Sequence, residues 1–384
     1  MATHVTRTNP SLPDEVIFVI LSRLPVKSLL RFRTACKSWL SLISSREFIK
    51  THISISNNDP HHVHHHLLIR HRSDRSNRSN FTTCSVYSLH NESFTESMVD
   101  DFSGQTFKLD HPGDIKCVIG CCNGLVCVRS ITCKGVFLFL WNPSTRKSRR
   151  LPKLDYMKTM STKFWLCYDE SDDDFKVFAM FNHRLGYKCK VAVYSLKSDF
   201  WRMIGDFRIG GLLYDGGKFS NGAIHWVVKR LEPVKSKIIL SFDIQTETFR
   251  EVLLPNNEGG TVLLKFDTFG EKLIVLIGYE NIRSDFWVLE EYGVEKGWKK
   301  LFTIPHDEIG FLAMREPMYM YPKPFCIFEN GDVLLHVNSA IVVYSTEHNT
   351  YKGLLDFGFG ALQCPYSAFA VTTMSRLRDD RDRD

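Results

Sequence analysis

The sequence of 384 residues lacks any apolar run long enough to cross a membrane. No uninterrupted run exceeds six residues, the length of the run from Val136 to Trp141, whereas a membrane-spanning helix needs about 18 or more. The first fifteen residues also lack the apolar centre of a secretory signal peptide. Eleven cysteines, an odd number, are too few in a chain of this length for a disulfide-stapled mini-fold. We therefore expect a protein without a membrane segment, in the cytoplasm or the nucleus.

Sequence motifs of the common enzyme classes are absent as well. The chain contains no G-x-S-x-G nucleophile elbow, no Walker loop, no G-x-G-x-x-G behind a strand and no H-E-x-x-H motif. His225, beside Trp226 in an apolar run, is the histidine that most invites a catalytic interpretation. A structural role is the simpler interpretation of a histidine in a strand that follows a turn. The sequence thus favours a non-catalytic protein without a cofactor.

Three clusters of potential metal ligands lack the spacing of a metal site. The cysteines do not form paired C-x2-C units. The acidic run has no glycine at the sixth position of a calcium loop and has Met180 where the bidentate glutamate would stand, so it predicts a hairpin turn instead. The histidines have no cysteine or carboxylate pattern beside them, and no metal site is expected. The clusters are Cys117, Cys121, Cys122, Cys127 and Cys133; Asp169, Glu170, Asp172, Asp173 and Asp174; and His61, His62, His64, His65 and His66.

The net charge of +6 is concentrated at the N-terminus. Residues 1–80 contain 12 Lys and Arg against 5 Asp and Glu, and the other 304 residues contain 37 against 38. Four arginines at positions 70, 72, 75 and 78 lie in a polar segment with one short strand expected at Leu67–Ile69. No aromatic stacking platform accompanies them. We therefore expect no nucleic-acid partner.

The segment from Leu12 to about Ile53 has the pattern of helices. Two acidic residues follow Pro13, which suits the first turn of a helix. Apolar residues recur at helical spacing on both sides of Pro25, which ends one helix and can begin the next. About forty residues of helix cannot bury this many large side chains among themselves. The helices either pack on the rest of the chain or form a surface for a partner.

From about residue 81 the chain reads as short strands in a degenerate repeat. Each copy has an apolar strand with an aromatic residue, followed by a polar turn and a further strand. Asn-Gly pairs, the strongest short signal for a β-hairpin, precede several copies. A repeat of about 50 residues fits one four-stranded propeller blade, and a β-sandwich gives no reason for such a period. The aromatic positions are Tyr87, Trp141, Tyr194, Phe242, Trp287 and Tyr344.

These features predict an α+β multidomain fold with five parts. A disordered N-terminus at 1–10 precedes a small helical domain at 11–53. A polar connection rich in His, Arg and Ser, with the first strand, covers 54–80. An all-β propeller-like domain of about six blades covers 81–374. The final segment, 375–384, alternates Arg and Asp and is expected to be a disordered tail.

Residues 11–50 closely resemble the F-box of plant F-box proteins over some forty ordered residues. The remainder resembles the F-box-associated interaction domain, which in the same family is described as kelch-like. The F-box matches are Leu12-Pro13, Ile20-Leu21, Arg23 to Leu29, Arg31-Phe32, Cys36 to Trp39 and Leu42-Ile43. The matches in the second domain are Cys122 to Leu125, Leu140 to Thr145, Tyr168-Asp169, Asp174 to Val177, Asn221 to Trp226 and Ser241 to Ile244.

The resemblance implies a substrate-recognition subunit of a Skp–cullin–F-box ubiquitin ligase. The F-box would dock on a Skp-type adaptor, which links it to cullin and RING subunits, and the propeller would recruit an unknown protein substrate for ubiquitination and degradation. Two alternatives stay open: a scaffold that binds the adaptor without ligase activity, and an enzyme that uses the propeller pocket. The resemblance implies adaptor binding by Leu12, Pro13, Leu21, Leu24, Pro25, Leu29 and Trp39.

Overall fold

The structure is a computed structural model of the whole chain. It describes residues 12–59, 61, 65–72, 79–91, 115–132, 135–145, 147–154, 162–182, 188–209, 211–213, 217–230, 237–255, 263–269, 272–279, 282–292, 294, 297–305, 322–337, 340–356 and 368–371. The two segments expected to be disordered, 1–10 and 375–384, lie outside these ranges, as does part of the histidine-rich insert.

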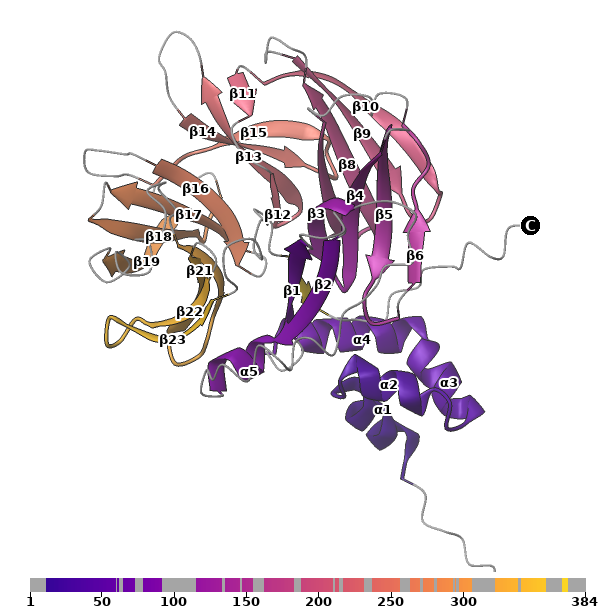
Figure 1. Cartoon of the computed structure of the whole chain (residues 1–384). Coiled ribbons are helices and arrows are strands. Elements are labelled where there is room, and N and C mark those ends of the chain that lie inside the picture. Colours follow the sequence, from indigo (N-terminus) through magenta and orange to yellow (C-terminus); the bar gives the residue numbers. More distant parts are fainter. Residues whose placement is uncertain are drawn as a thin grey trace, which may run out of the picture.

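Helices form the N-terminal domain, as predicted. Pro13 and Pro25 occupy the N-cap positions of the first two helices, where a missing backbone N–H costs no hydrogen bond. The Ser45 hydroxyl accepts a hydrogen bond from the backbone N–H of Phe48 and so begins the fourth helix. The four helices, at the bottom of Figure 1, are α1 (Asp14–Ser22), α2 (Val26–Phe32), α3 (Lys37–Ser44) and α4 (Arg46–Asn57).

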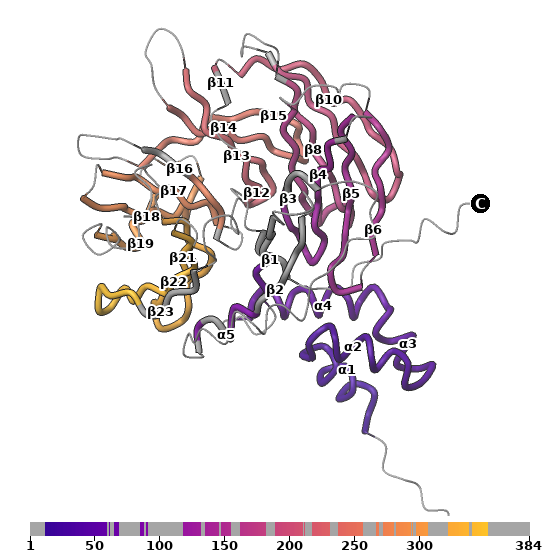
Figure 2. The backbone as a smooth tube through the Cα atoms, viewed as in Figure 1, coloured from indigo at the N-terminus to yellow at the C-terminus, as the bar shows by residue number. Residues whose placement is uncertain are grey.

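In the described residues, five antiparallel blades surround a common axis (Figure 2), and their strands pair in chain order in every blade except blade 3. Blade 1 contains β3 (Ile115–Cys122), β4 (Leu125–Thr132), β5 (Gly135–Asn142) and β6 (Lys147–Arg150). Blade 2 contains β7 (Lys163–Asp169), β8 (Asp174–Asn182), β9 (Lys188–Ser195) and β10 (Phe200–Arg208). In blade 3, β11 (Gly211–Leu213) and β12 (Lys218–Ser220) both pair with β13 (Ala223–Arg230), followed by β14 (Lys237–Asp243) and β15 (Thr248–Val252).

The last two blades repeat this arrangement. Blade 4 contains β16 (Leu263–Phe269), β17 (Lys272–Tyr279), β18 (Arg283–Leu289) and β19 (Trp298–Pro305). Blade 5 contains β20 (Lys323–Ile327), β21 (Asp332–Val337), β22 (Ala340–Ser345) and β23 (Thr350–Asp356). Apolar clusters fill the spaces between neighbouring blades, for example between blades 2 and 3. The propeller core is therefore a ring of inter-blade contacts.

A sixth sheet joins the two ends of the propeller sequence. It consists of β1 (His65–Arg72), β2 (Ser79–Ser85) and the late strand β24 (Ala368–Val371), with β1 in the middle. Antiparallel pairing sets His66 opposite Ala370, and β24 lies against β3 of blade 1. Five blades and this sheet confirm the prediction of about six. The strand expected at Leu67–Ile69 lies within β1.

A short helix, α5 (Val86–Asn91), connects the sixth sheet to blade 5. The Nε2 atom of His90 lies 3.2 Å from Oδ2 of Asp332, and the His90 ring stacks on Phe328 with centroids 3.8 Å apart. The interpretation of Tyr87 as a strand aromatic is wrong, because Tyr87 lies in this helix with its side chain exposed while Val86 is buried.

The other five repeat aromatics all lie on the third strand of their blades. The Tyr194 hydroxyl donates to Oδ1 of Asp199 at 2.7 Å, and the Tyr344 hydroxyl donates to Oδ1 of Asn349 at 3.1 Å. Each acceptor lies five residues on, in the turn to the fourth strand, and has a positive φ, 56° and 53°. Asp and Asn tolerate this backbone region better than most residues. In these two blades, the hydroxyl of the buried repeat tyrosine thus hydrogen-bonds to the residue that shapes the next turn.

Hairpin turns at one end of the propeller face the F-box helices. Oδ1 of Asp173, in the β7–β8 turn predicted from the acidic run, lies 2.9 Å from Nζ of Lys50, and its other oxygen pairs with Arg46. The Asn57 amide donates to Oδ1 of Asn123 in the β3–β4 turn at 3.3 Å. We call this end of the propeller the F-box end and the opposite end the open end.

The carboxylate of Asp173 is held in its charged form. Partial burial acts against the charge, but a hydrogen bond from the Tyr168 hydroxyl and the cations of Lys50 and Arg46 lower the pKa of Asp173 to about 2. Its φ of 52° also makes this position one that an aspartate or asparagine adopts readily. The turn therefore presents a fixed negative charge to α4.

Substitution of Asp173 and Lys50 tests the contact between the two domains. In a double-mutant cycle with Asp173→Asn and Lys50→Met, we expect a coupling of about 0.5–1 kcal/mol in the free energy of unfolding. The value is small because half of the Lys50 side chain is exposed. Asparagine keeps the turn geometry, so the cycle isolates the charge. A coupling of zero in chemical denaturation would show that this ion pair does not hold α4 in solution.

Candidate protein-interaction surface

One face of α1 and the residues before it expose large apolar side chains. Leu12, Val16, Val19 and Ile20 are 58%, 41%, 49% and 47% exposed. Their spacing of four, three and one places them along one side of a helix. We call these four residues the α1 stripe. Surface apolar residues scattered singly are ordinary, but a continuous stripe indicates a contact with another molecule.

The core of the F-box helices is complete without the α1 stripe. Ile17 and Phe18 face the interior, and the Phe18 ring meets that of Phe48 edge to face at 5.4 Å. Nε2 of His52 lies 3.0 Å from the carbonyl oxygen of Leu24 and links α4 to the α1–α2 turn. The buried members of this core are Leu21, Val26, Leu29, Ile43 and Phe48.

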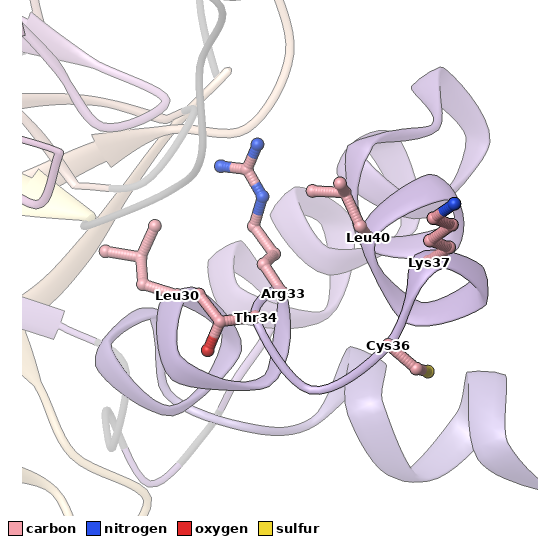
Figure 3. A pocket seen from close by; sticks show the side chains of 6 residues that line it. All are labelled: Leu30, Arg33, Thr34, Cys36, Lys37 and Leu40. Atoms are coloured by element: carbon pink, nitrogen blue, oxygen red, sulfur yellow. The ribbon is translucent and has the colours of Figure 1, made fainter.

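A shallow hollow of about 560 Å³ lies between α2 and α3 (Figure 3). Arg33 lies between the two leucines of its rim, Leu30 and Leu40, and Leu40 is 43% exposed. The rim thus combines apolar side chains with the cations of Arg33 and Lys37, and suits a partner that is apolar with acidic groups beside it. Its lining residues are Leu30, Arg33, Thr34, Cys36, Lys37 and Leu40.

Cys36 is an exposed thiol at this hollow and forms the N-cap of α3. Its Sγ atom lies 3.1 Å from the Ser38 hydroxyl. That hydrogen bond, with help from the backbone N–H of Trp39, lowers the pKa of the Cys36 thiol. The residue is part of the predicted F-box motif.

The structure separates the seven predicted adaptor-binding residues into three groups. Leu12, Pro13 and Pro25 are exposed, whereas Leu24 and Trp39 are half-buried. Leu21 and Leu29 are 2% and 0% exposed and belong to the core of the helices. In the free chain, these two leucines pack in the core beneath the surface and support the helices that carry it. Their predicted part in adaptor binding stays a prediction.

Sequence reasoning missed five exposed apolar residues that the structure brings to this surface. Val16, Val19 and Ile20 belong to the α1 stripe, and Phe32 and Leu40 lie on the neighbouring helices at 36% and 43% exposure. The Phe32 ring packs against the Trp39 ring edge to face at 5.4 Å. Helical spacing alone could have paired Val16 with Ile20, but it could not tell the outer face from the inner one.

Of the residues considered for catalysis or metal binding, Cys133, His62 and His64 lie outside the described residues, and His225 and Cys127 lie in structural settings. His225 is fully buried on β13, with Nε2 3.1 Å from the Tyr292 hydroxyl, and burial lowers its pKa to about 4. The ring is therefore neutral near pH 7. Cys127 is buried in the core of blade 1, and the cysteines recorded in the described ranges are free thiols. In the described part of the chain, no three His, Cys, Asp or Glu side chains are grouped so as to hold a metal ion.

Among the helices that the structure describes, none combines the length and the apolar character needed to cross a bilayer.

Comparison with known proteins accounts for both domains. Residues 10–51 match the F-box domain, and residues 66–347 match the F-box associated beta propeller domain. An F-box/kelch-repeat protein of Arabidopsis thaliana is 29% identical over 357 residues, covering 89% of each chain. The F-box protein CPR1 of the same plant is 27% identical over 400 residues, covering 96% of this chain and 88% of its own. The chain therefore belongs to the F-box proteins that carry an F-box-associated β-propeller domain.

Proposed function

We propose that this protein is the substrate-recognition subunit of a Skp–cullin–F-box ubiquitin ligase. The observation that carries the proposal is the α1 stripe, an apolar surface left uncovered on F-box helices whose own core is already filled. A helical apolar surface of this kind suits insertion against the helices of a partner. The Skp-type adaptor, which links F-box subunits to cullin and RING subunits, is that partner.

The charges around the surface support an acidic adaptor. The exposed residues Arg23, Lys27, Arg31 and Lys37 lie on or beside α1 to α3. Cations at the rim of an interface increase the association rate with an acidic partner and add little to the final affinity. The apolar stripe supplies the larger part of the binding free energy.

In this function the protein performs no chemistry with its own side chains. The adaptor holds one end of the molecule and the propeller holds a target protein, so the target stays near a ubiquitin-charged enzyme. The gain is effective concentration and orientation. The ion pair between α4 and the β7–β8 turn supports a fixed geometry between the two bound proteins. This function places the protein in the cytoplasm or the nucleus.

Reconstitution of the complex tests the proposal. The full chain, co-expressed with a plant Skp-type adaptor, should elute with it at one-to-one stoichiometry in size exclusion. Addition of cullin, RING and charging enzymes should then give ubiquitin transfer that depends on this chain, at first to the chain itself because its target is unknown. Co-elution without transfer would favour the scaffold function. A soluble chain that binds no adaptor would overturn the proposal.

A further inference from the structure

The two ends of the propeller differ in charge, although its net charge is close to zero. In each blade the first and third turns lie at the F-box end, and the second turn and the exit to the next blade lie at the open end. In blades 2 and 3 the turns at the F-box end carry mainly carboxylates, among them Asp169, Asp172, Asp173 and Glu247. Because successive turns of an antiparallel blade lie at alternate ends, charges that alternate along the sequence are separated between the two ends of the propeller.

Cations gather at the open end of the same two blades. Arg208 is the last residue of β10 and pairs with the first residue of β9, and Lys237 begins β14 opposite Lys229 at the end of β13. These register positions fix the residues at one end of the sheets. Together they form the open-end patch: Lys163, Lys190, Arg208, Lys229, Arg230 and Lys237.

Two carboxylates accompany these six cations in the described residues of blades 2 and 3. Oδ1 of Asp206 lies 3.9 Å from Nζ of Lys190, and Glu251 pairs with Arg230. Both pairs are exposed at the surface, where such contacts are weak and easily exchanged. Among the described residues at this end of blades 2 and 3, cations thus outnumber carboxylates at a surface that a ligand can reach.

Apolar side chains lie at the same end of blades 3 and 4. Leu253, which follows β15, is 54% exposed, and Ile282, in the β17–β18 turn, is 64% exposed. Among the described residues at the open end, these are the large apolar side chains with the greatest exposure, and both are aliphatic. Cations beside aliphatic groups fit a peptide with carboxylates and leucine-like side chains. Single-stranded nucleic acid is bound mainly through exposed aromatic rings on which its bases stack.

We infer that the open-end patch binds an acidic segment of the protein that this receptor recruits. The inference rests on the proposed function, which leaves this end of the propeller facing away from the adaptor. It names the class of target: a chain with a surface segment rich in Asp and Glu and containing aliphatic residues. Complementary charge at an interface sets partner choice and association rate.

Fluorescence anisotropy with a labelled peptide of Glu, Asp and Leu tests the inference on the full chain in complex with its adaptor. Binding should weaken as salt rises, and a peptide with Gln and Asn in place of the acids should not bind. Lys190→Glu with Lys229→Glu should weaken binding about tenfold at low salt. The matched control, Lys272→Glu with Lys299→Glu, makes the same change in net charge at the F-box end and should leave binding unchanged.

Each other outcome has a distinct meaning. Equal binding of the acidic and amide peptides, or by both charge variants, would overturn the inference. So would tighter binding of a single-stranded RNA of matched charge, which would assign the patch to nucleic acid. Co-elution with the adaptor, measured on the same samples, separates these failures from failure of the proposed function. If the adaptor binds and the acidic peptide does not, the inference alone is wrong.

Discussion

Replacing Val19 and Ile20 with aspartate is expected to abolish co-elution with the Skp-type adaptor while the chain stays folded. Both side chains are about half exposed in the free chain and lie outside the apolar core of the F-box helices, so the substitutions leave that core filled. In the complex they would bury two charges in an apolar interface. Loss of the two apolar contacts and the added desolvation cost should total at least about 4 kcal/mol, or a thousandfold in Kd.

The matched control for this experiment lies on the propeller. Phe200 and Met203 of β10 are 64% and 41% exposed, so Phe200→Asp with Met203→Asp makes the same chemical change away from α1. This variant should bind the adaptor as the wild type does. Isothermal titration and circular dichroism of both variants separate binding from folding. If the Val19 and Ile20 variant binds with unchanged affinity, the α1 stripe is not the adaptor surface.

Core positions of the F-box cannot serve in this test. Leu29 is fully buried, and a charge there would disrupt the helices themselves. Leu24 and Trp39 are half-buried and pack on the same core, so their substitution mixes lost packing with lost binding. The exposed stripe gives the cleaner experiment.

Asp267→Asn is expected to lower the free energy of unfolding by about 3 kcal/mol, the second large effect. The carboxylate lies on β16 between two lysines of the adjoining blades, 2.6 Å from Nζ of Lys218 and 3.0 Å from Nζ of Lys323. Its side chain is 15% exposed. Removal of one member of a buried ion cluster leaves the other charges uncompensated, which costs about 3–5 kcal/mol. We expect a loss at the lower end of this range, because the side chains of Lys218 and Lys323 are partly exposed to water.

Urea denaturation provides the measurement. The midpoint should fall at an unchanged slope, because the surface exposed on unfolding stays the same. Asp206→Asn is the matched control, since its 3.9 Å contact with Lys190 is exposed and should contribute less than about 1 kcal/mol. A loss for Asp267→Asn no larger than that of the control would show that the three blades are held by their apolar contacts alone.

The stability difference between wild type and Asp267→Asn should also depend on pH. Burial opposes the charge of Asp267, but Lys218 and Lys323 outweigh it and lower the pKa to about 2. A carboxyl group with a depressed pKa in the folded state stabilises the fold above its unfolded pKa of about 4. The contribution is lost as the pH falls toward 2. The two denaturation midpoints should therefore converge with acidification, and parallel curves would contradict this assignment.

The propeller repeat was readable from the sequence because its signals are local. Trp141, Tyr194 and Tyr344 are each buried, and each is followed by a turn a few residues later. In each case the aromatic residue and its turn lie within one hairpin. Two of the three Asn-Gly pairs, at 123–124 and 221–222, have positive φ at both residues, as a two-residue hairpin turn requires, whereas in the third pair only Gly331 has positive φ. The segment around Tyr87 has the same sequence pattern as the segment around Tyr194 but does not form a strand. It follows β2 as the helix α5, and the third strand of the sixth sheet is β24, far along the chain.

The sequence by itself determined the F-box and the existence of a repeated β-domain, since helix periodicity, proline positions and turn residues act over a few neighbours. Tertiary structure decided the rest. Which apolar residues of α1 stay outside depends on how α4 packs against it, and ring closure depends on β1 meeting β24. The charge of the open end arises only when antiparallel strands bring distant turns to the same side. The net charge of the propeller does not reveal this separation, because adding up charges along the sequence ignores where the strands place them.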